Sequence, residues 1–196
     1  MSTLTISNYT LKHFDLRAKS IMDEYLKLIN VDVSDYTFAG NYIWLSTATG
    51  FYTIVNETFC LFILNSGELT MLLPPIGKKE NTYDAMIQCF EIMNSHNSNR
   101  NYSKIEYVHE ELLEGFVDYL EEGTLVYEML KDFIIEKKLV DYIYKVEDLI
   151  DLKGDSYKSK RNEINRFRNV YPNHKIEILD KEKHGSAVMA LFNKWV

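Results

Sequence analysis

The sequence predicts a mixed α/β (α+β) protein in which helices cover an antiparallel or mixed sheet. Stretches with apolar residues at helical spacing alternate with short runs rich in β-branched and aromatic residues. Turn-forming residues separate these runs, and no internal repeat is visible. The 196 residues are 46% hydrophobic and 13% aromatic, with only 8 Gly and 3 Pro. This composition is typical of a globular protein with one sizeable core.

The chain is expected to begin with a short strand followed by two helices. The strand is predicted in "TLKHFDL" (10–16), and apolar residues at helical spacing predict a helix in 16–30. Ser34 or Asp35 is expected to cap a second helix in the residues that follow, because short polar side chains satisfy free N–H groups at a helix start.

β-branched and aromatic residues then dominate 51–77 and predict three antiparallel strands. The run is interrupted at Asn56-Glu57 and again at Asn65-Ser66-Gly67, where hairpin turns are expected. Pro74-Pro75 is expected to end the last strand, because proline cannot donate to a sheet ladder.

Helices and strands are expected to alternate in the following segment. Helical spacing predicts a helix in 82–96, and the polar tract 94–103 predicts a solvated loop. "KIEYV" (104–108) predicts a strand and "HEELLEGFVDYLEE" (109–122) a helix. Residues 127–152 are expected to combine strands with a short helix around "VEDL".

The net charge and the cysteines limit which partners and which cellular location are expected for the protein. The formal net charge of −7 argues against attraction of the whole surface to nucleic acid or anionic lipid, so any such contact must be local. Cys60 and Cys89 lie in apolar stretches and are expected to be buried free thiols. We see no signal peptide and no apolar run of the ~18–20 residues of a membrane span. A reducing, cytoplasmic location without a membrane span is therefore expected.

Local motifs for catalysis or metal binding are weak. "HEELL" (109–113) resembles the start of a zinc-protease motif, but Leu113 stands where the second histidine is required. We therefore expect no metal site and interpret His109 as a helix-start residue. Dispersed glycines argue against a phosphate-binding loop, and "PPIGKK" (74–79) is interpreted as an ordinary turn. The sequence alone identifies no catalytic residues.

One basic stretch, "YKSKRNEINRFRNVYP" (157–172), departs from the acidic character of the chain. Its pattern predicts an amphipathic helix whose apolar residues Ile164, Phe167 and Tyr171 dock it. Gly154 is expected to form the preceding bend, Asp155 or Ser156 to cap the helix, and Pro172 to stop it. The candidate anion-binding or tRNA-binding residues are Lys158, Lys160, Arg161, Asn162, Asn165, Arg166 and Arg168.

Two interpretations of this basic helix are open. Its cationic face is either a solvated surface neutralised by neighbouring acids or a binding site for an anionic partner. Arginine forks bind phosphate or carboxylate through two hydrogen bonds, and the interleaved asparagines add orientation. Such a face suits a tRNA backbone, a nucleotide or a lipid headgroup.

The segment "VEDLIDLKGDSYKSKRNEINRF" (146–167) resembles the signature of the phosphatidylglycerol lysyltransferase C-terminal-domain family. "VSDYTFAGNYIW" (33–44) and "LLPPIG" (72–77) match earlier segments of that family in the same order, so the resemblance extends from about residue 10 onward. It implies two GNAT-like α/β halves joined by a positively charged helix. The sequence departs from the pattern at Asp155 and Ser156, where members often carry basic residues.

The resemblance also implies an activity and partners. Better-understood relatives move an aminoacyl group from aminoacyl-tRNA to an acceptor, and their basic helix is thought to meet the tRNA acceptor end. An aminoacyl-tRNA or acyl-CoA donor is implied by resemblance only, and no other cofactor is expected. The residues that fall on this helix are Lys158, Lys160, Arg161, Asn162, Asn165 and Arg166.

The resemblance divides the chain into a GNAT-like domain (1–153), a basic connector helix (154–172), and the first strand and helix of an incomplete second half (173–196). We therefore expect an acyltransferase-type protein that is inactive as this chain alone. A non-catalytic module that binds an anionic partner is the alternative. A homodimer through the C-terminal helix is also open, because this helix presents Val188, Leu191, Phe192 and Trp195 with little to cover them.

Overall fold

The computed structural model describes residues 3–45, 49–122, 134–137 and 140–195. The chain forms two compact units, Met1–Asp141 and Tyr142–Val196. This division lies upstream of the predicted boundary after residue 153, so the short helix around "VEDL" is part of the second unit. The mixed α+β class predicted from the sequence is confirmed by helices on a five-stranded antiparallel sheet in the described residues.

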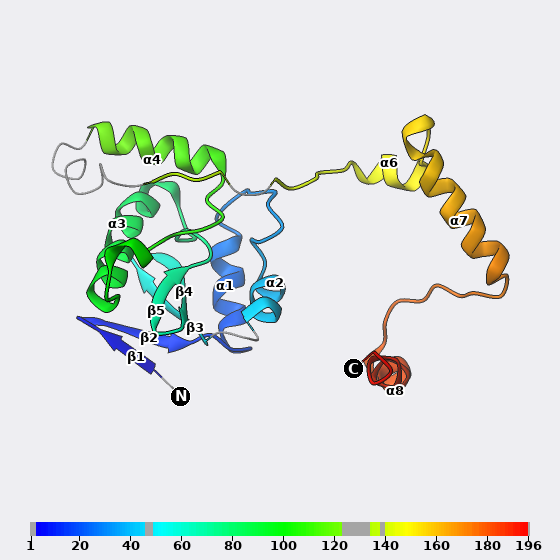
Figure 1. The fold of residues 1–196 in the computed structure, drawn as a ribbon, viewed down its shortest axis with the longest axis horizontal. Helices are drawn as coiled ribbons and strands as arrows, with labels where there is room; N and C mark the ends of the chain where they lie inside the picture. The colour runs from blue at the N-terminus through cyan, green and yellow to red at the C-terminus, as the bar shows by residue number, and fades with distance from the viewer. Residues whose placement is uncertain (1–2, 46–48, 123–133, 138–139, 196) are drawn as a thin grey trace. The chain divides into compact units, whose positions relative to one another are not determined.

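The sheet of the first unit is an antiparallel meander in which the strands follow one another in chain order (Figure 1). Three of the strands were predicted as a group in 51–77, and β2 was predicted from 10–16. Strand β1 was not predicted from the sequence. It is short and, among the described strands, pairs with β2 alone. The strands are β1 (Thr3–Ile6), β2 (Tyr9–His13), β3 (Thr49–Val55), β4 (Thr58–Asn65) and β5 (Glu68–Met71).

Two tight turns set the register of the central strands, and both were predicted. Asn56 and Glu57 have φ of 43° and 56°, and Ser66 and Gly67 have φ of 53° and 87°. Consecutive left-handed residues match the right-handed twist of the flanking strands, which favours two-residue hairpins. The first turn is also tied to a helix start, because Asn56 Nδ2 donates to Asn81 O at 2.9 Å and Asn81 Nδ2 donates to Glu57 Oε2 at 3.2 Å.

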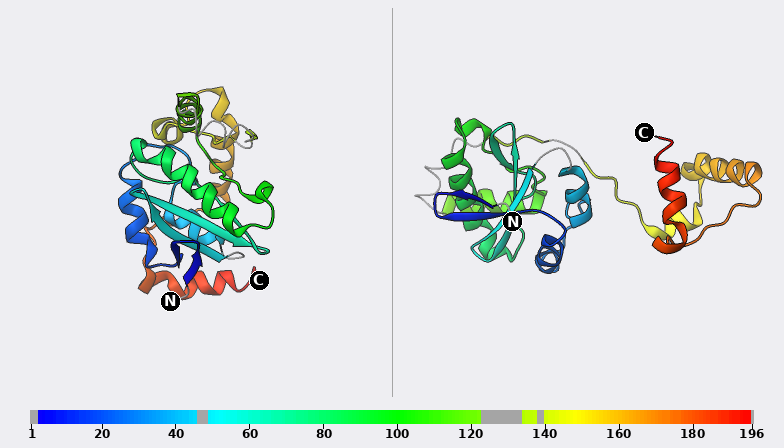
Figure 2. Two further views of the ribbon diagram at one scale, coloured as in Figure 1. Left: turned by 90° about the vertical axis from the view of Figure 1, so that its left-hand side faces the viewer. Right: turned by 90° about the horizontal axis from the view of Figure 1, so that it is seen from below.

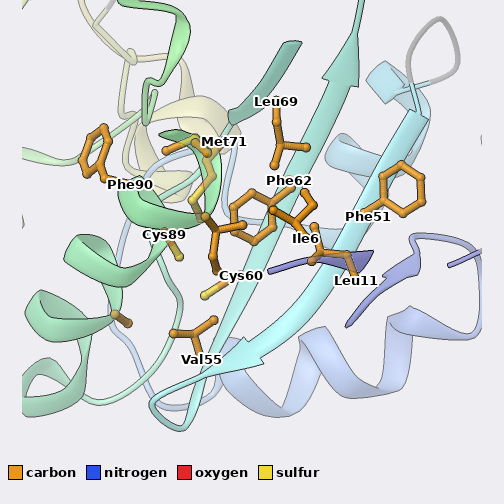
Figure 3. Close-up of a cluster of buried hydrophobic side chains, with 13 residues drawn as sticks. Ile6, Leu11, Phe51, Val55, Cys60, Phe62, Leu69, Met71, Cys89 and Phe90 are labelled. Carbon is orange, nitrogen blue, oxygen red and sulfur yellow. The ribbon is translucent and has the colours of Figure 1, made fainter. Parts of the chain in front are cut away.

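Strand β4 is buried on both faces and divides the core in two. Cys60 and Phe62 join one cluster of buried side chains, shown in Figure 3, whereas Phe59 and Leu61 join another. The alternation follows from the two-residue period of a strand. A nearly continuous apolar run is what such a doubly covered strand requires.

Helices cover both faces of the sheet. The first face is covered by α1 (Ala18–Leu26) and α2 (Phe38–Trp44), whose Ala18, Met22 and Phe38 pack in the cluster of Phe59. The opposite face is covered by α3 (Lys79–His96), which runs across the sheet in Figure 2.

The predicted cap of α2 is wrong. Thr37 is the N-cap, and its Oγ1 accepts a hydrogen bond from Gly40 N at 3.1 Å. Ser34 and Asp35 lie instead in the turn before it, where Tyr36 N donates to Val33 O at 3.1 Å and Thr37 N donates to Asp35 O at 2.9 Å. The turn places Thr37, rather than either predicted residue, next to the free N–H groups of the helix.

The predicted buried thiols are confirmed. Cys60 of β4 and Cys89 of α3 are both free and buried, and Figure 3 shows them pointing toward one another. Burial raises the pKa of the Cys89 thiol well above its ordinary value, and a hydrogen bond with Cys60 adds to this effect. The Cys89 thiol therefore stays protonated, and both cysteines act as core side chains.

Helix α4 (Glu110–Glu122) packs on the outside of α3. Met86, Leu112 and Phe116 form the small core between them, and Tyr119 Oη donates to Asp84 Oδ1 at 2.5 Å. A Cβ atom at position 115 would lie 2.1 Å from Tyr83 Oη. A larger residue at 115 would therefore force the Tyr83 side chain to move.

The strands predicted after α3 are largely absent from the described residues. The polar loop contains the 3₁₀ turn η2 (Arg100–Tyr102). In 104–108 only Ile105 forms a bridge, parallel to Met71, with hydrogen bonds of 2.9 Å on either side. No strand occurs in 134–137 or 140–145, and the remaining predicted strand residues of that segment lie outside the described part of the chain.

The second unit contains three helices in its described residues, α6 (Val146–Asp151), α7 (Lys158–Val170) and α8 (Lys181–Phe192), and the 3₁₀ turn η3 (Asp155–Tyr157). The strand predicted in 173–179 is not formed, and Ile176 and Ile178 are 92% and 95% exposed. A strand needs a neighbour for its backbone hydrogen bonds, and no described residue supplies one here.

We expect Phe62→Ala to lower the free energy of unfolding of the first unit by about 3–5 kcal/mol, because Phe62 is fully buried between β4 and α3 and its loss leaves a cavity. Urea unfolding followed by circular dichroism measures this change. As a control, Ile54→Ala on β3 removes a side chain that is 43% exposed and should cost under about 1 kcal/mol. Equal losses for the two variants would contradict the assigned core.

Candidate functional site

Helix α7 carries all seven residues that the sequence analysis proposed for anion binding. The helix runs from Lys158 to Val170 and ends before Pro172, as predicted. Its start differs from the prediction, because Asp155 and Ser156 lie in the η3 turn and the N-cap is Tyr157, without a side-chain cap. Gly154 has φ of 85° and forms the expected bend.

Arg161 is committed to the second unit itself. Its guanidinium Nη1 donates to the backbone carbonyl of Gly154 at 2.7 Å and to that of Leu152. Leu152 is the left-handed C-cap of α6, where carbonyl groups lack helical partners. Arg161 therefore links the end of α6 to the first turns of α7. We assign it a structural role ahead of the predicted role in anion binding.

The other cations of α7 differ in whether they form ion pairs. Lys160 Nζ lies 3.2 Å from Glu163 Oε2, an exposed pair one helical turn apart. Lys158, Arg166 and Arg168 are exposed and form no ion pair with any residue that the structure describes. At 100° per residue these three lie, with Asn162 and Asn165 between them, on one arc of less than half the helix circumference.

Exposed aromatic rings lie on the opposite side of the helix from this arc, and Arg166 stands at the border between the two sides. Phe167 and Tyr171 are 48% and 56% exposed, with ring centroids 5.1 Å apart. His174 adds an edge-on contact to Phe167 at 5.0 Å. A shallow groove of about 290 Å³ runs over Arg166, Phe167 and Tyr171. Within the described residues of the second unit, the apolar face of α7 is therefore exposed and not docked as the sequence analysis expected.

Asp180 is the N-cap of α8, and its carboxylate accepts from Lys183 N at 2.8 Å. Val188, Leu191 and Phe192 are about half exposed, in line with the apolar face predicted from the sequence. A homodimer through this helix stays a prediction.

The first unit contains a cavity that the sequence analysis did not identify. Its volume is about 220 Å³, and it lies where the starts of α3 and α4 meet the loop after α1. Two segments of its wall, "PPIGKK" and "HEELL", were predicted from the sequence as a turn and a helix start, and neither was predicted to line a cavity. Folding brings them together, and no local spacing could have shown this. The cavity is lined by Leu28, Ile29, Asn30, Val31, Tyr36, Pro74, Pro75, Gly77, Lys79, Thr82, His109, Glu111 and Leu112.

His109 directly precedes α4, in line with its interpretation as a helix-start residue, and it lines the cavity. Leu112 N donates to His109 Nδ1 at 3.4 Å, which leaves Nε2 as the protonated nitrogen of the neutral ring. Burial lowers the pKa of His109 below its ordinary value of 6.5, while nearby Glu111 raises it and Lys79 lowers it. The neutral imidazole therefore offers an N–H donor at neutral pH.

Tyr36 also lines this cavity. Its hydroxyl donates to the carbonyl of Tyr107 at 3.1 Å, and its ring lies edge-on to His109 at 5.9 Å. Burial raises the pKa of the Tyr36 phenol. Thr82 is buried beside it and donates to Lys78 O at 3.0 Å. The cavity thus combines satisfied polar groups with an apolar wall.

We expect Arg161→Gln to loosen the junction of α6 and α7, because a neutral amide cannot reproduce the charged hydrogen bonds to two carbonyl groups. The cost should be about 1 kcal/mol, since the site is only partly buried. Hydrogen exchange of the amides in 149–161 measures it as faster exchange. Arg168→Gln, which removes an exposed arginine of the same helix, should leave exchange in this segment unchanged.

His109 should make the first unit less stable in acid. Its folded pKa lies below that of the unfolded chain, so the unfolded state binds more protons and stability is lost as the pH falls below about 6.5. Urea midpoints measured between pH 7.5 and 5 should therefore decline less in His109→Gln than in the parent chain. His96→Gln serves as the control and should retain the decline.

The structure also bears on membrane insertion. Across the described residues, no helix has both the length and the apolar character needed to cross a bilayer.

Comparison with known proteins identifies one family. The family described as phosphatidylglycerol lysyltransferase, C-terminal, matches residues 26–196, which include the cavity and α7. No curated protein and no solved structure gave a match. The match covers most of the sequence and bears out the resemblance seen in it. The chain belongs to the phosphatidylglycerol lysyltransferase C-terminal family.

Proposed function

We propose that the protein takes part in an aminoacyl-transfer or acyl-transfer reaction and that α7 binds the acceptor end of a tRNA. The observation that carries this proposal is the arc of cations on α7 that form no ion pair with a described residue. Family membership supports the transfer class. A cytoplasmic location is part of the proposal, because aminoacyl-tRNA is used there.

The chemistry of the arc favours a single-stranded phosphate backbone. Lys158, Arg166 and Arg168 provide positive charge at three separate positions, and Asn162 and Asn165 provide hydrogen bonds between them. Proteins that bind single strands combine a cationic track with rings on which bases stack, each stack contributing about 1–3 kcal/mol. Phe167 and Tyr171 are exposed rings on the opposite side of α7, where they share a groove with Arg166.

A binding module without catalytic activity is the second candidate. It is favoured by the side chains of the seven proposed residues, which are lysine, arginine and asparagine and suit the binding of phosphate. In both candidate functions α7 binds the anionic partner, so one titration of the chain with tRNA tests this shared step.

The affinity of the chain for tRNA should fall steeply with salt. Contacts from three cations release about three counterions, so raising salt from about 50 to 200 mM should weaken binding by about 20- to 40-fold. Fluorescence titration of labelled tRNA at the two salt concentrations measures this. Arg166→Glu combined with Arg168→Glu should remove most of the binding.

The matched control is Lys175→Glu combined with Lys194→Glu, which changes the net charge by the same amount at exposed positions of the second unit. It should retain most of the affinity. Equal losses for the two double variants would show that only net charge matters and would contradict an α7 site. Binding to anionic vesicles with no binding to tRNA would favour a lipid headgroup instead.

A further inference from the structure

The cavity at the starts of α3 and α4 has the features of a small-molecule site, and it lies apart from α7 in the first unit. Its volume of about 220 Å³ equals the share of about seven water molecules in the liquid. Pockets for drug-sized ligands start at about 300 Å³. The cavity therefore has room for one small metabolite.

Its wall has an apolar part of defined shape. Leu28, Ile29 and Val31 follow the end of α1, and Pro74 and Pro75 face them from the loop after β5. Both prolines are buried, and prolines in a fixed loop lose little entropy when a ligand is bound. A short branched hydrocarbon group fits such a wall.

Opposite charges flank the cavity. Lys79 and Glu111 both line it, and neither forms an ion pair with a described residue. The Lys79 side chain lies along α4, because its Cε atom is 3.4 Å from the place a Cβ would take at position 115, one helical turn beyond Glu111. Both charges also act on His109. One cation and one carboxylate thus line the same cavity.

We infer that the cavity binds a small zwitterion, a free α-amino acid with a short branched apolar side chain. The carboxylate of the ligand pairs with the Lys79 ammonium, and its ammonium group pairs with the Glu111 carboxylate. His109 Nε2–H adds a neutral donor, and the side chain of the ligand contacts the wall of Leu28 and Pro75. A net anion or cation leaves one of the two protein charges unmatched.

Calorimetric titration of the full chain tests this with three probes of similar shape: L-leucine, 4-methylpentanoate, which lacks the ammonium group, and 3-methylbutylamine, which lacks the carboxylate. L-leucine should bind about tenfold or more tightly than either analogue, because each charge-assisted contact is lost in one of them. Equal affinity for the three probes, tighter binding of an analogue, or no heat from any probe at tens of millimolar would overturn the inference.

Two variants locate the charges. Lys79→Gln should weaken L-leucine about tenfold and leave 3-methylbutylamine unchanged, whereas Glu111→Gln should weaken L-leucine and leave 4-methylpentanoate unchanged. Both positions are exposed, so the fold should not depend on them. Lys78→Gln and Glu114→Gln are matched controls outside the cavity lining and should bind L-leucine as the parent does. Unchanged binding of L-leucine in both cavity variants would reject the site.

Discussion

The burial of β4 on both faces is the constraint on which the first unit depends. A strand whose side chains alternate between two cores needs helices on both sides, and α1 with α2 and α3 supply them. This arrangement fixes where α3 begins. Because α3 starts next to the β3–β4 turn and α4 packs against α3, the cavity at the two helix starts is a consequence of how the sheet is covered.

The second unit is organised by a different interaction. Few of its apolar side chains are even partly buried, and the arrangement of α6 and α7 depends on the guanidinium group of Arg161 against two backbone carbonyls. This structural role of Arg161 changes how the basic stretch 157–172 is interpreted. Part of its charge holds the chain in shape, and only the remaining cations are available to a phosphate.

The elements that could be predicted from the sequence are those with a strong local pattern. The turns at Asn56-Glu57 and Ser66-Gly67, the long helix α3 and the basic helix α7 all carry such a pattern. The predicted strand in 173–179 failed because a strand depends on a neighbour that local sequence does not specify. The cavity could not be predicted for a similar reason, because Tyr36, Lys79 and His109 come from three segments that are distant in the sequence. The role of Arg161 was also hidden, since its partners are backbone carbonyls, which carry no sequence signal.

The two-residue hairpins have a consequence for the order in which the protein acquires its shape. Most pairings of β3 with β4 and of β4 with β5 join residues close together in the chain. Loop closure over such short separations is fast, and contacts of low sequence separation speed folding. A ribosome that has released β5 has already supplied the whole central meander. The polypeptide can therefore assemble its middle sheet during synthesis, before the residues of the basic helix have been translated.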